Sequence, residues 1–341
     1  MKSNGSIKDI ARKAGVSVAT VSRVINKSGR YSTETEKRVT RVIAENNYEP
    51  NLIARGLRVQ KMKNVGIIVP DIVNEFFMKL VHEIEMNLFA HGYQTFLCNT
   101  DEDEELERKR VQMMVMQNVC GLIFLSGGGA DMSYLNSGIP TVFIDRFPNE
   151  IRDNYCMISS DNIQGGYLAT KELIDQGCRR ILLVTSRRKI SAYADRFEGY
   201  VRALVKSGMD AGDIHVSYLD GLRYADAYQE IGRILDAGEF DYDGIFAEAD
   251  WLALGCYKAL AERGISVPAQ VKIVGYDDIS ITAFNLVPLT TIRQQVDEIG
   301  RLAAEYLLRI IDGEEVKQHM VKVPVYLLPR ESTRGPAQKE N

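Results

Sequence analysis

The sequence predicts an α/β protein with doubly wound parallel sheets, preceded by a small helical unit at the N-terminus. From Val65 onward, short apolar runs alternate with amphipathic stretches, which is the pattern of βαβ units. The charge of the N-terminal unit differs from that of the rest of the chain. Residues 1–60 contain 12 Lys and Arg against 5 Asp and Glu, whereas the remaining residues contain 30 and 41. A basic unit on an acidic body indicates that only the basic unit meets a polyanion.

The first element is a pair of short helices joined by a turn, predicted from SIKDIARKAGVSVATVSRVIN at residues 6–26. Apolar residues recur at helical spacing before Gly15, which provides the turn, and Ser17 is placed to cap the second helix. The second helix buries Val21 and leaves small polar side chains on its other faces. A helix-turn-helix presents a second helix of this kind to the major groove of DNA.

A third helix is predicted from STETEKRVTRVIAENN, with Thr33 and Glu36 forming a capping box. Pro50 ends this helix, and Asn51 is placed to cap a short helix over residues 52–58. So short a helix does not persist alone in water. The segment is therefore either a flexible linker or a hinge that becomes helical on DNA.

The apolar runs after the hinge predict buried parallel strands; they are VGIIVP, YQTFLCN, CGLIFLS, TVFIDR, ILLVTS, GIFAEAD and VKIVGYD. About eleven strand candidates in all exceed what one compact sheet usually holds, so we expect two sheets side by side. In such folds ligands bind beyond the carboxyl ends of the strands.

Motifs for catalysis are missing from the sequence. The glycine-rich LSGGGAD at 125–131 lacks the Lys-Ser/Thr of a phosphate loop, and the four histidines have no nucleophile nearby in sequence. The acidic run DEDEELE at 101–107 predicts a solvated helix N-terminus rather than a metal site. We expect no enzyme activity, no cofactor and no metal.

The sequence also lacks signals for a membrane or for export. No apolar stretch reaches ~18 residues, and the start MKSNGSIKDI lacks the apolar core of a signal peptide. The five cysteines have no C-x-x-C spacing, which fits reduced thiols. We expect a cytoplasmic protein with no membrane association.

Several of these segments resemble the LacI/GalR family of bacterial transcription regulators. The resemblance rests on the stretch from Ile7 to Asn26, on YEPNLIARGL, and on the blocks SSDNIQGGYLATKEL, RFEGYVRAL and VGYDDIS, which stand in family order. It implies three parts. These are a helix-turn-helix DNA-binding headpiece at 1–50, a hinge helix and linker at 51–61, and an effector-binding core at 62–341 similar to periplasmic sugar-binding proteins.

The resemblance divides the core into two subdomains joined by three crossings, near Asn162, Thr291 and Pro324. Strand TTIRQ and the segment VKVPVYLLPRES fit the late crossings. The expected ranges are about 62–161 with 292–323 for subdomain 1, and about 162–291 with 324–334 for subdomain 2.

In the headpiece, the resemblance implies that Val18, Ala19 and Arg23 read bases, with Arg23 suited to a bidentate contact with guanine. Leu57 matches a wedge that enters the minor groove, and Ala54 lies on the same side of the hinge helix. The alternative for each residue is a solvated side chain. Small donors and acceptors suited to phosphate oxygens are Ser17, Thr20, Ser22, Asn26, Ser32, Thr35, Tyr48 and Asn51.

In the core, the resemblance implies an effector cleft. Phe76, Phe77 and Tyr224 would offer aromatic faces to a sugar ring, and Arg196 and Asp277 would hold its hydroxyls. The alternative for the aromatic residues is a place in the hydrophobic core.

Other positions extend the cleft or depart from the family pattern. Arg146 follows FID and is expected to point into the cleft. Ala249-Asp250 replaces the usual Asn-Asp pair, so Asp250 is expected to act alone, and Ala192 stands where a polar contact is common. The charged residues would suit a neutral, an amino or an acidic sugar.

The sequence therefore favours a homodimeric repressor of carbohydrate-utilisation genes. It would bind a palindromic operator in double-stranded DNA under the control of a small sugar-like effector. The ending RGPAQKEN carries no heptads for a tetramer. The alternatives are a sugar-binding protein without a DNA role and a sugar-modifying enzyme. The effector, the operator and the sign of the response stay open.

Overall fold

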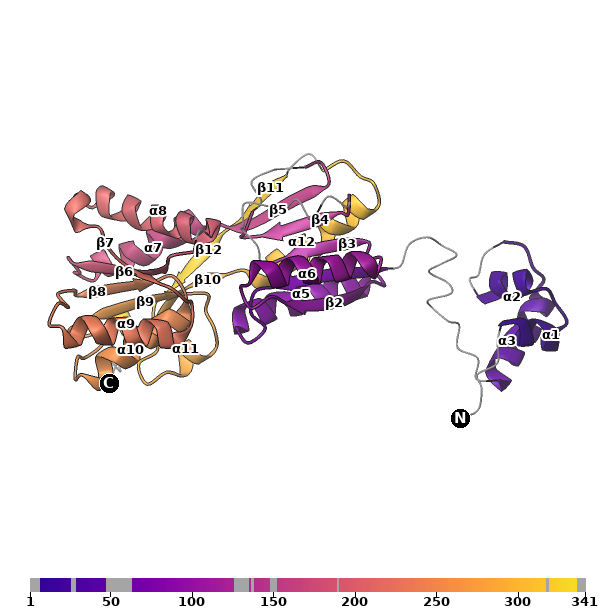
Figure 1. Cartoon of the computed structure of the whole chain (residues 1–341), viewed down its shortest axis with the longest axis horizontal. Helices are drawn as coiled ribbons and strands as arrows, with labels where there is room; N and C mark the ends of the chain where they lie inside the picture. The colour runs from indigo at the N-terminus through magenta and orange to yellow at the C-terminus, as the bar shows by residue number, and fades with distance from the viewer. Residues whose placement is uncertain are drawn as a thin grey trace, which may run out of the picture. The chain divides into compact units, whose positions relative to one another are not determined.

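The computed structural model describes residues 7–25, 29–46, 63–125, 135, 138–147, 152–188, 190–316 and 319–335. The chain divides into two compact units between residues 62 and 63, and their elements are labelled in Figure 1. The expected hinge helix at 51–61 lies outside the described residues.

The N-terminal unit is a bundle of three helices around a small core. Its helices are α1 (Ile7–Ala14), α2 (Val18–Ile25) and α3 (Thr33–Glu45). Ile10, Val21 and Val39, one from each helix, are completely buried and belong to the same hydrophobic cluster. Gly15, with a φ of 64°, makes the turn between α1 and α2. The predicted helix-turn-helix is confirmed.

The larger unit contains two six-stranded sheets (Figure 1). In the first sheet the order is β11-β5-β4-β3-β1-β2, and every pair is parallel. Its strands are β1 (Asn64–Val69), β2 (Gln94–Asn99), β3 (Gly121–Phe124), β4 (Thr141–Ile144), β5 (Tyr155–Ser160) and β11 (Met320–Val323).

The second sheet repeats this plan in the order β12-β10-β9-β8-β6-β7, with only the β10–β12 pair antiparallel. Its strands are β6 (Ile181–Ser186), β7 (His215–Leu219), β8 (Gly244–Ala247), β9 (Lys272–Tyr276), β10 (Thr290–Gln294) and β12 (Val325–Leu328). The predicted doubly wound α/β class with two sheets is confirmed.

Helices connect the strands and cover both sheets. Those packed on the first sheet are α5 (Glu75–Ala90), α6 (Glu104–Met116) and α12 (Val296–Ile311). Those of the second half are α7 (Asn162–Asp175), α8 (Ser191–Lys206), α9 (Tyr224–Asp236), α10 (Asp250–Glu262), α11 (Ile281–Phe284) and α13 (Glu331–Arg334), with the short 3₁₀ turn η2 (Ala211–Asp213).

The chain passes between the two sheets three times. It leaves the first sheet after Ser160, returns to it after Gln294, and crosses once more at Pro324, the single residue between β11 and β12. The second crossing was expected near Thr291, but residues 292–294 still pair with β12. The strand continues because the antiparallel ladder with β12 extends to its last residue.

One predicted buried strand is different in the structure. Strand β2 lies at the edge of the first sheet, and its Phe96 and Leu97 are about 40% and 43% exposed. Only β1 pairs with β2, so no strand lies along its other edge. Its apolar side chains therefore have fewer neighbours to cover them than those of a central strand.

No described helix is long and apolar enough to cross a membrane. None of the five cysteines forms a disulfide. The described residues also contain no group of three or more His, Cys, Asp or Glu side chains that could hold a metal ion.

Candidate functional site

Helix α2 in the N-terminal unit begins with a side-chain cap. The hydroxyl of Ser17 accepts a hydrogen bond from the amide of Thr20 at 3.1 Å, and the two hydroxyls lie 2.9 Å apart. Capping satisfies an amide that the first turn would leave unpaired. The predicted cap at Ser17 is therefore present, and it fixes the end of the helix that carries Val18 and Ala19.

The outer surface of α2 carries the residues expected to read bases. Ala19 and Arg23 are exposed, and Val18 and Ser22 are partly buried. The methylenes of Arg23 run beside Gly29, whose added Cβ would lie 3.4 Å from the Arg23 Cδ. Gly29 therefore leaves space beside the stem of Arg23, which is exposed as a residue.

Helix α3 repeats the same cap one residue earlier than predicted. Ser32, not Thr33, is the N-cap, and its hydroxyl accepts from the amide of Thr35 at 3.2 Å. The expected capping box of Thr33 with Glu36 is therefore wrong. The extended backbone of Ser32 permits the cap, whereas Thr33 already belongs to the helix.

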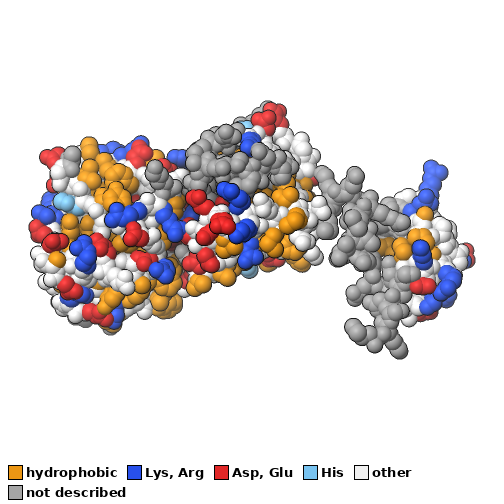
Figure 2. Space-filling model, in the orientation of Figure 1, with side chains coloured by type: hydrophobic (Ala, Val, Ile, Leu, Met, Phe, Trp, Pro, Cys, Tyr) orange, Lys and Arg blue, Asp and Glu red, His pale blue; other side chains and the backbone are white. Residues whose placement is uncertain are grey.

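The face of the N-terminal unit seen in Figure 2 carries mainly Lys and Arg among its charged side chains. Five of the predicted DNA-contact residues lie outside the described residues; they are Asn26, Tyr48, Asn51, Ala54 and Leu57.

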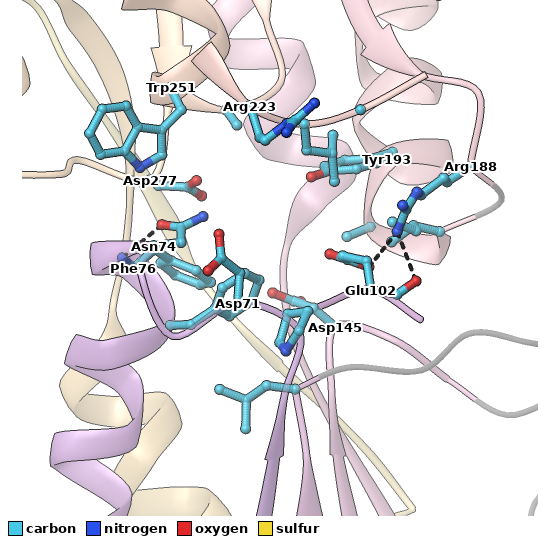
Figure 3. Close-up of a pocket in the computed structure, with 18 of the residues that line it drawn as sticks. Asp71, Asn74, Phe76, Glu102, Asp145, Arg188, Tyr193, Arg223, Trp251 and Asp277 are labelled. Carbon is cyan, nitrogen blue, oxygen red and sulfur yellow. Dashed lines mark hydrogen bonds and ion pairs between the residues drawn. The ribbon is translucent and has the colours of Figure 1, made fainter. Parts of the chain in front are cut away.

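In the larger unit, one cavity of about 810 Å³ opens at the carboxyl ends of both sheets. Its walls come from the segments after β1, β2, β3 and β4 of the first sheet and after β6, β7, β8 and β9 of the second. Parallel sheets place ligands at this end. Figure 3 shows Trp251, Arg223 and Tyr193 facing Asp71 and Asp145 across the open space.

Six of the seven predicted effector residues line this cavity; they are Phe76, Phe77, Arg146, Arg196, Tyr224 and Asp277. Phe76 and Phe77 meet edge to face, with ring centroids 5.3 Å apart. Phe76 is nevertheless buried and packed in the core, so the alternative of a core residue is confirmed, while its contact with an effector stays a prediction.

Arg196 is buried at the base of the cavity and held on several sides. Its Nε donates to the Oδ1 of Asn162 at 2.9 Å, and one terminal nitrogen donates to the carbonyl of Glu248 at 2.5 Å. Its guanidinium carbon lies 3.6 Å from the centroid of the Tyr276 ring. These contacts fix the guanidinium in one orientation toward the cavity.

Asp277 follows β9 and has an unusual backbone, with a φ of 110°. Its carboxylate accepts from the Nε2 of Gln294 at 2.7 Å. Burial raises its pKa to about 7, although the nearby charge of Arg196 acts in the opposite direction. A carboxyl in this state can donate or accept a hydrogen bond near neutral pH.

Asp145 holds the corresponding position after β4, with a φ of 57°. One of its oxygens accepts from the hydroxyl of Ser159, the amide of Ser160 and the amide group of Asn162, at 3.1, 2.9 and 3.0 Å. Burial still raises its pKa above the ordinary value. Asn162 thereby links Asp145 of the first half to Arg196 of the second.

The acidic residues at strand ends share a strained backbone. Asp101, Glu102, Asp145 and Asp277 all have positive φ, and all line the cavity. Such conformations are costly for residues other than glycine and cluster at functional sites.

Asp250 is not where it was expected. Its side chain is completely buried and does not line the cavity. Its oxygens accept from the Thr291 hydroxyl at 2.7 Å and the Ile279 amide at 2.9 Å, so the carboxyl ties α10 to the following loops. Burial, with repulsion from Asp277, raises its pKa well above the ordinary value. The neighbouring Trp251 reaches the cavity instead.

Other lining residues were not predicted from the sequence; they include Asp71, Asn74, Glu102, Asp145, Arg188, Tyr193, Arg223 and Trp251. Their shared signal is a position just after a predicted strand or at the start of the next helix. The run at 101–107 was interpreted only as a solvated helix start. Asp103 does cap α6, but Glu102 enters the cavity.

Comparison with known proteins links both units to regulators. Residues 6–51 match the family described as bacterial regulatory proteins, lacI family, and residues 170–333 match the periplasmic binding protein-like domain. The ribose operon repressor of Halalkalibacterium halodurans is 34% identical over 340 residues, which cover 98% of this chain and 99% of the relative.

Solved structures share the fold. A LacI family transcriptional regulator from Enterococcus faecium, with bound ribose, has a TM-score of 0.72 and 29% identity over 79% of this chain and 98% of that chain. The lac repressor dimer bound to operator and the anti-inducer ONPF has a TM-score of 0.86 at 24% identity, over 97% and 99% of the two chains. At this level of identity, the likeness to the lac repressor establishes a shared fold and nothing more.

Proposed function

Because this chain belongs to the LacI family of bacterial regulatory proteins, we propose that it is a cytoplasmic transcriptional repressor whose affinity for an operator is controlled by a small sugar-like effector. The observation that carries the proposal is the combination, in one chain, of a helix-turn-helix unit and a cleft shared by two parallel sheets. The ribose operon repressor matches both parts together over 98% of this chain. The chain is a regulator and not an enzyme.

In this proposal α2 enters the major groove of the operator. Arg23 is exposed and carries the donors for a bidentate contact with guanine, while the exposed Ala19 lets the helix come close. Hydroxyls at the caps, among them Ser17 and Ser32, would bind phosphate oxygens with the hydrogen atoms that capping does not use. The roles assigned to Leu57 and the hinge stay predictions from the resemblance.

The repressor would act as a homodimer on a palindromic operator. A single headpiece buries too little surface to select one site in a genome, and a twofold dimer matches a palindrome. Apolar side chains suited to pairing with a second copy are exposed along one edge of the first sheet, on β2 and on the two helices that contact it. They are Met86 and Phe89 of α5, Phe96 and Leu97 of β2, and Met113 and Met116 of α6.

The cleft would bind the effector between the two halves of the core. Arg196, Asp277 and Asp145 provide donors and acceptors for hydroxyl groups, and the aromatic walls suit the apolar face of a ring. Because the three crossings allow the halves to rotate, a ligand that prefers one arrangement shifts its population. A differential affinity of ~1–3 kcal/mol suffices to change operator affinity by one or two orders of magnitude.

The test has two stages. Selection of DNA from a randomised palindromic library, followed by mobility-shift titration, identifies the operator. A thermal-shift screen of sugars and related metabolites against the full chain then finds the effector, which is added to the operator titration. A chain that enriches no sequence from the library would refute the regulator. A chain that binds a sugar but no DNA would instead be a sugar-binding protein.

A further inference from the structure

Two arginines converge on one carboxylate inside the cleft. Arg146, which follows β4 of the first sheet, donates to both oxygens of Glu102 at 2.7 and 2.8 Å. Arg188, which follows β6 of the second sheet, donates to the Glu102 carboxylate at 3.1 Å and to its carbonyl at 3.2 Å. Figure 3 shows Arg188 beside Glu102 at one edge of the cavity, with both contacts dashed. Glu102 is thus bound by both halves of the core.

This cluster is largely withdrawn from solvent. The side chains of Arg146 and Glu102 are 6% and 18% exposed, and Arg188 is 40% exposed. Burial alone would raise the pKa of Glu102, but hydrogen bonds and charges from Arg146 and Arg188 outweigh it and hold the pKa below the ordinary value. Glu102 is therefore a fixed anion at neutral pH, in a left-handed backbone with a φ of 59°.

Arg146 and Arg188 together could form a binding site for an oxyanion if Glu102 did not occupy them. Two guanidinium groups that converge on one point bind carboxylate or phosphate oxygens tightly and directionally. Here a side chain of the protein already occupies that point, because Glu102 accepts from both.

The rest of the cavity offers little to an anion. Its described lining holds seven carboxylates and four guanidinium groups. Arg223 is paired with Asp226. Arg196 keeps donors for a ligand after its bonds to Asn162 and Glu248, but the carboxyls of Asp145 and Asp277 lie near it and repel an anion. No described Lys or Arg forms a salt bridge with Asp145 or Asp277, which stay available to a ligand's hydroxyl or ammonium hydrogens.

We propose that Glu102 determines the charge specificity of the cleft. By occupying Arg146 and Arg188 it excludes effectors that carry a phosphate or carboxylate and leaves the cleft to uncharged or cationic ligands. The inference rests on the proposed function of the cleft as the effector site. It narrows the effector from sugars and sugar derivatives in general to those without an acidic group.

Inorganic phosphate is the probe, because it needs no knowledge of the effector. Isothermal titration calorimetry on the full chain would compare the wild type, Glu102→Gln and the double variant Glu102→Gln with Arg188→Gln. Glu102→Gln should bind phosphate at least tenfold more tightly than the wild type, and the double variant should lose that gain. Phosphate that binds the basic headpiece contributes equally to all three and cancels in the comparison.

Asp71→Asn is the matched control. It removes the same charge from the cavity wall but releases no arginine, since Asp71 accepts only from the amide of Val73 among the described contacts. Its phosphate affinity should equal that of the wild type. If Asp71→Asn gained as much phosphate affinity as Glu102→Gln, the overall charge of the cavity, and not the arginine pair, would determine phosphate binding.

The proposal is overturned if folded Glu102→Gln binds phosphate no better than the wild type, because Glu102 would then only orient Arg146. Circular dichroism checks folding, and Glu102→Met, of similar length, replaces the amide variant if that variant unfolds. D-ribose and D-ribose 5-phosphate extend the comparison to sugars. The operator titration reports failure of the regulator separately, since the phosphate measurement does not depend on DNA binding.

Discussion

Gly166 in α7 lies directly against the backbone carbonyl of Arg196 in α8: a Cβ on Gly166 would sit 2.1 Å from that oxygen. The relationship is reciprocal, since a Cβ on Gly199 would sit 2.1 Å from the carbonyl of Ile163. Two helices can approach this closely only where side chains are missing. The close packing fixes the position of α8 and therefore of the buried Arg196 in the cleft.

Gly166→Ala should lower the free energy of unfolding by about 1–3 kcal/mol or more, because the added methyl group meets backbone that cannot turn aside. Urea denaturation followed by circular dichroism measures the change. Gly232→Ala in α9 is the control, since its Cβ would meet only the flexible end of Arg263 at 3.0 Å. Equal losses in the two variants would contradict the argument from close packing.

Operator binding should weaken steeply with salt, because the Lys and Arg of the headpiece replace counterions on the phosphates. Titrations between about 50 and 200 mM salt should show the affinity falling by orders of magnitude, with a linear log–log slope. A nearly flat slope would rule out a phosphate-dominated interface.

Arg23→Ala should reduce operator affinity and abolish the preference at one base pair of each half-site. A lost bidentate contact costs ~1–3 kcal/mol of discrimination. Arg41→Ala, an exposed arginine on α3 rather than α2, is the control and should preserve base preference. Binding to a library of operators with single substitutions distinguishes the two. Unchanged preferences in Arg23→Ala would show that it does not read bases.

Asp277→Ala should abolish the response to the effector while operator binding without effector stays normal, since Asp277 lines the cleft and lies far along the chain from the headpiece. Calorimetry with the effector found by screening, and operator titration with and without it, give both quantities. Asp236→Ala, which removes a carboxylate outside the cavity lining, should respond as the wild type does. A normal response in Asp277→Ala would remove this residue from the site.

Glu248 makes stability depend on pH. Its side chain is completely buried, Oε2 accepts from the Thr185 hydroxyl, and Oε1 has no hydrogen-bond partner within the described residues. Burial raises its pKa from 4.5 to about 8. The folded state thus holds a proton that the unfolded state loses, so this stabilisation is complete below about pH 4.5 and is lost as the pH rises through about 8.

Glu248→Gln should remove that loss, because an amide does not ionise. At about pH 9 the variant should be more stable than the wild type by an amount on the order of a few kcal/mol, and the two should converge toward pH 5. Urea unfolding across this range measures the difference. Parallel curves for the two proteins would mean that Glu248 does not titrate in this window.

Much of the architecture follows from local pattern. Apolar runs and helical periodicity predict the two sheets and the headpiece, since both patterns depend on which face is buried. The cap of α3 was misplaced by one residue because Ser32 and Thr33 both stand three residues before a partner that fits a cap. The exposure of β2 could not be predicted, since edge or centre depends on strand order rather than on the strand's own residues.

The candidate site was predictable only in part, for the same reason. Phe76, Arg196 and Asp277 stand in segments that the family resemblance locates. Glu102 and Arg188 are 86 residues apart in sequence, and only the packing of the two halves brings them together. Whether Asp250 or Trp251 faces the cavity depends on the rotation of α10 about its axis, which the sequence pattern near Ala249 did not settle.

Because the chain crosses three times between the halves of the core, neither half is encoded by one continuous stretch of the gene. Each half is assembled from stretches interleaved along the chain, with β11 and β12 divided only by Pro324. Recombination cannot replace one half with a single exchanged segment, whereas the headpiece is a continuous stretch that one exchange can replace. A lineage can therefore exchange the headpiece or the whole core in one event, but one half of the cleft cannot be exchanged as a single segment without the other.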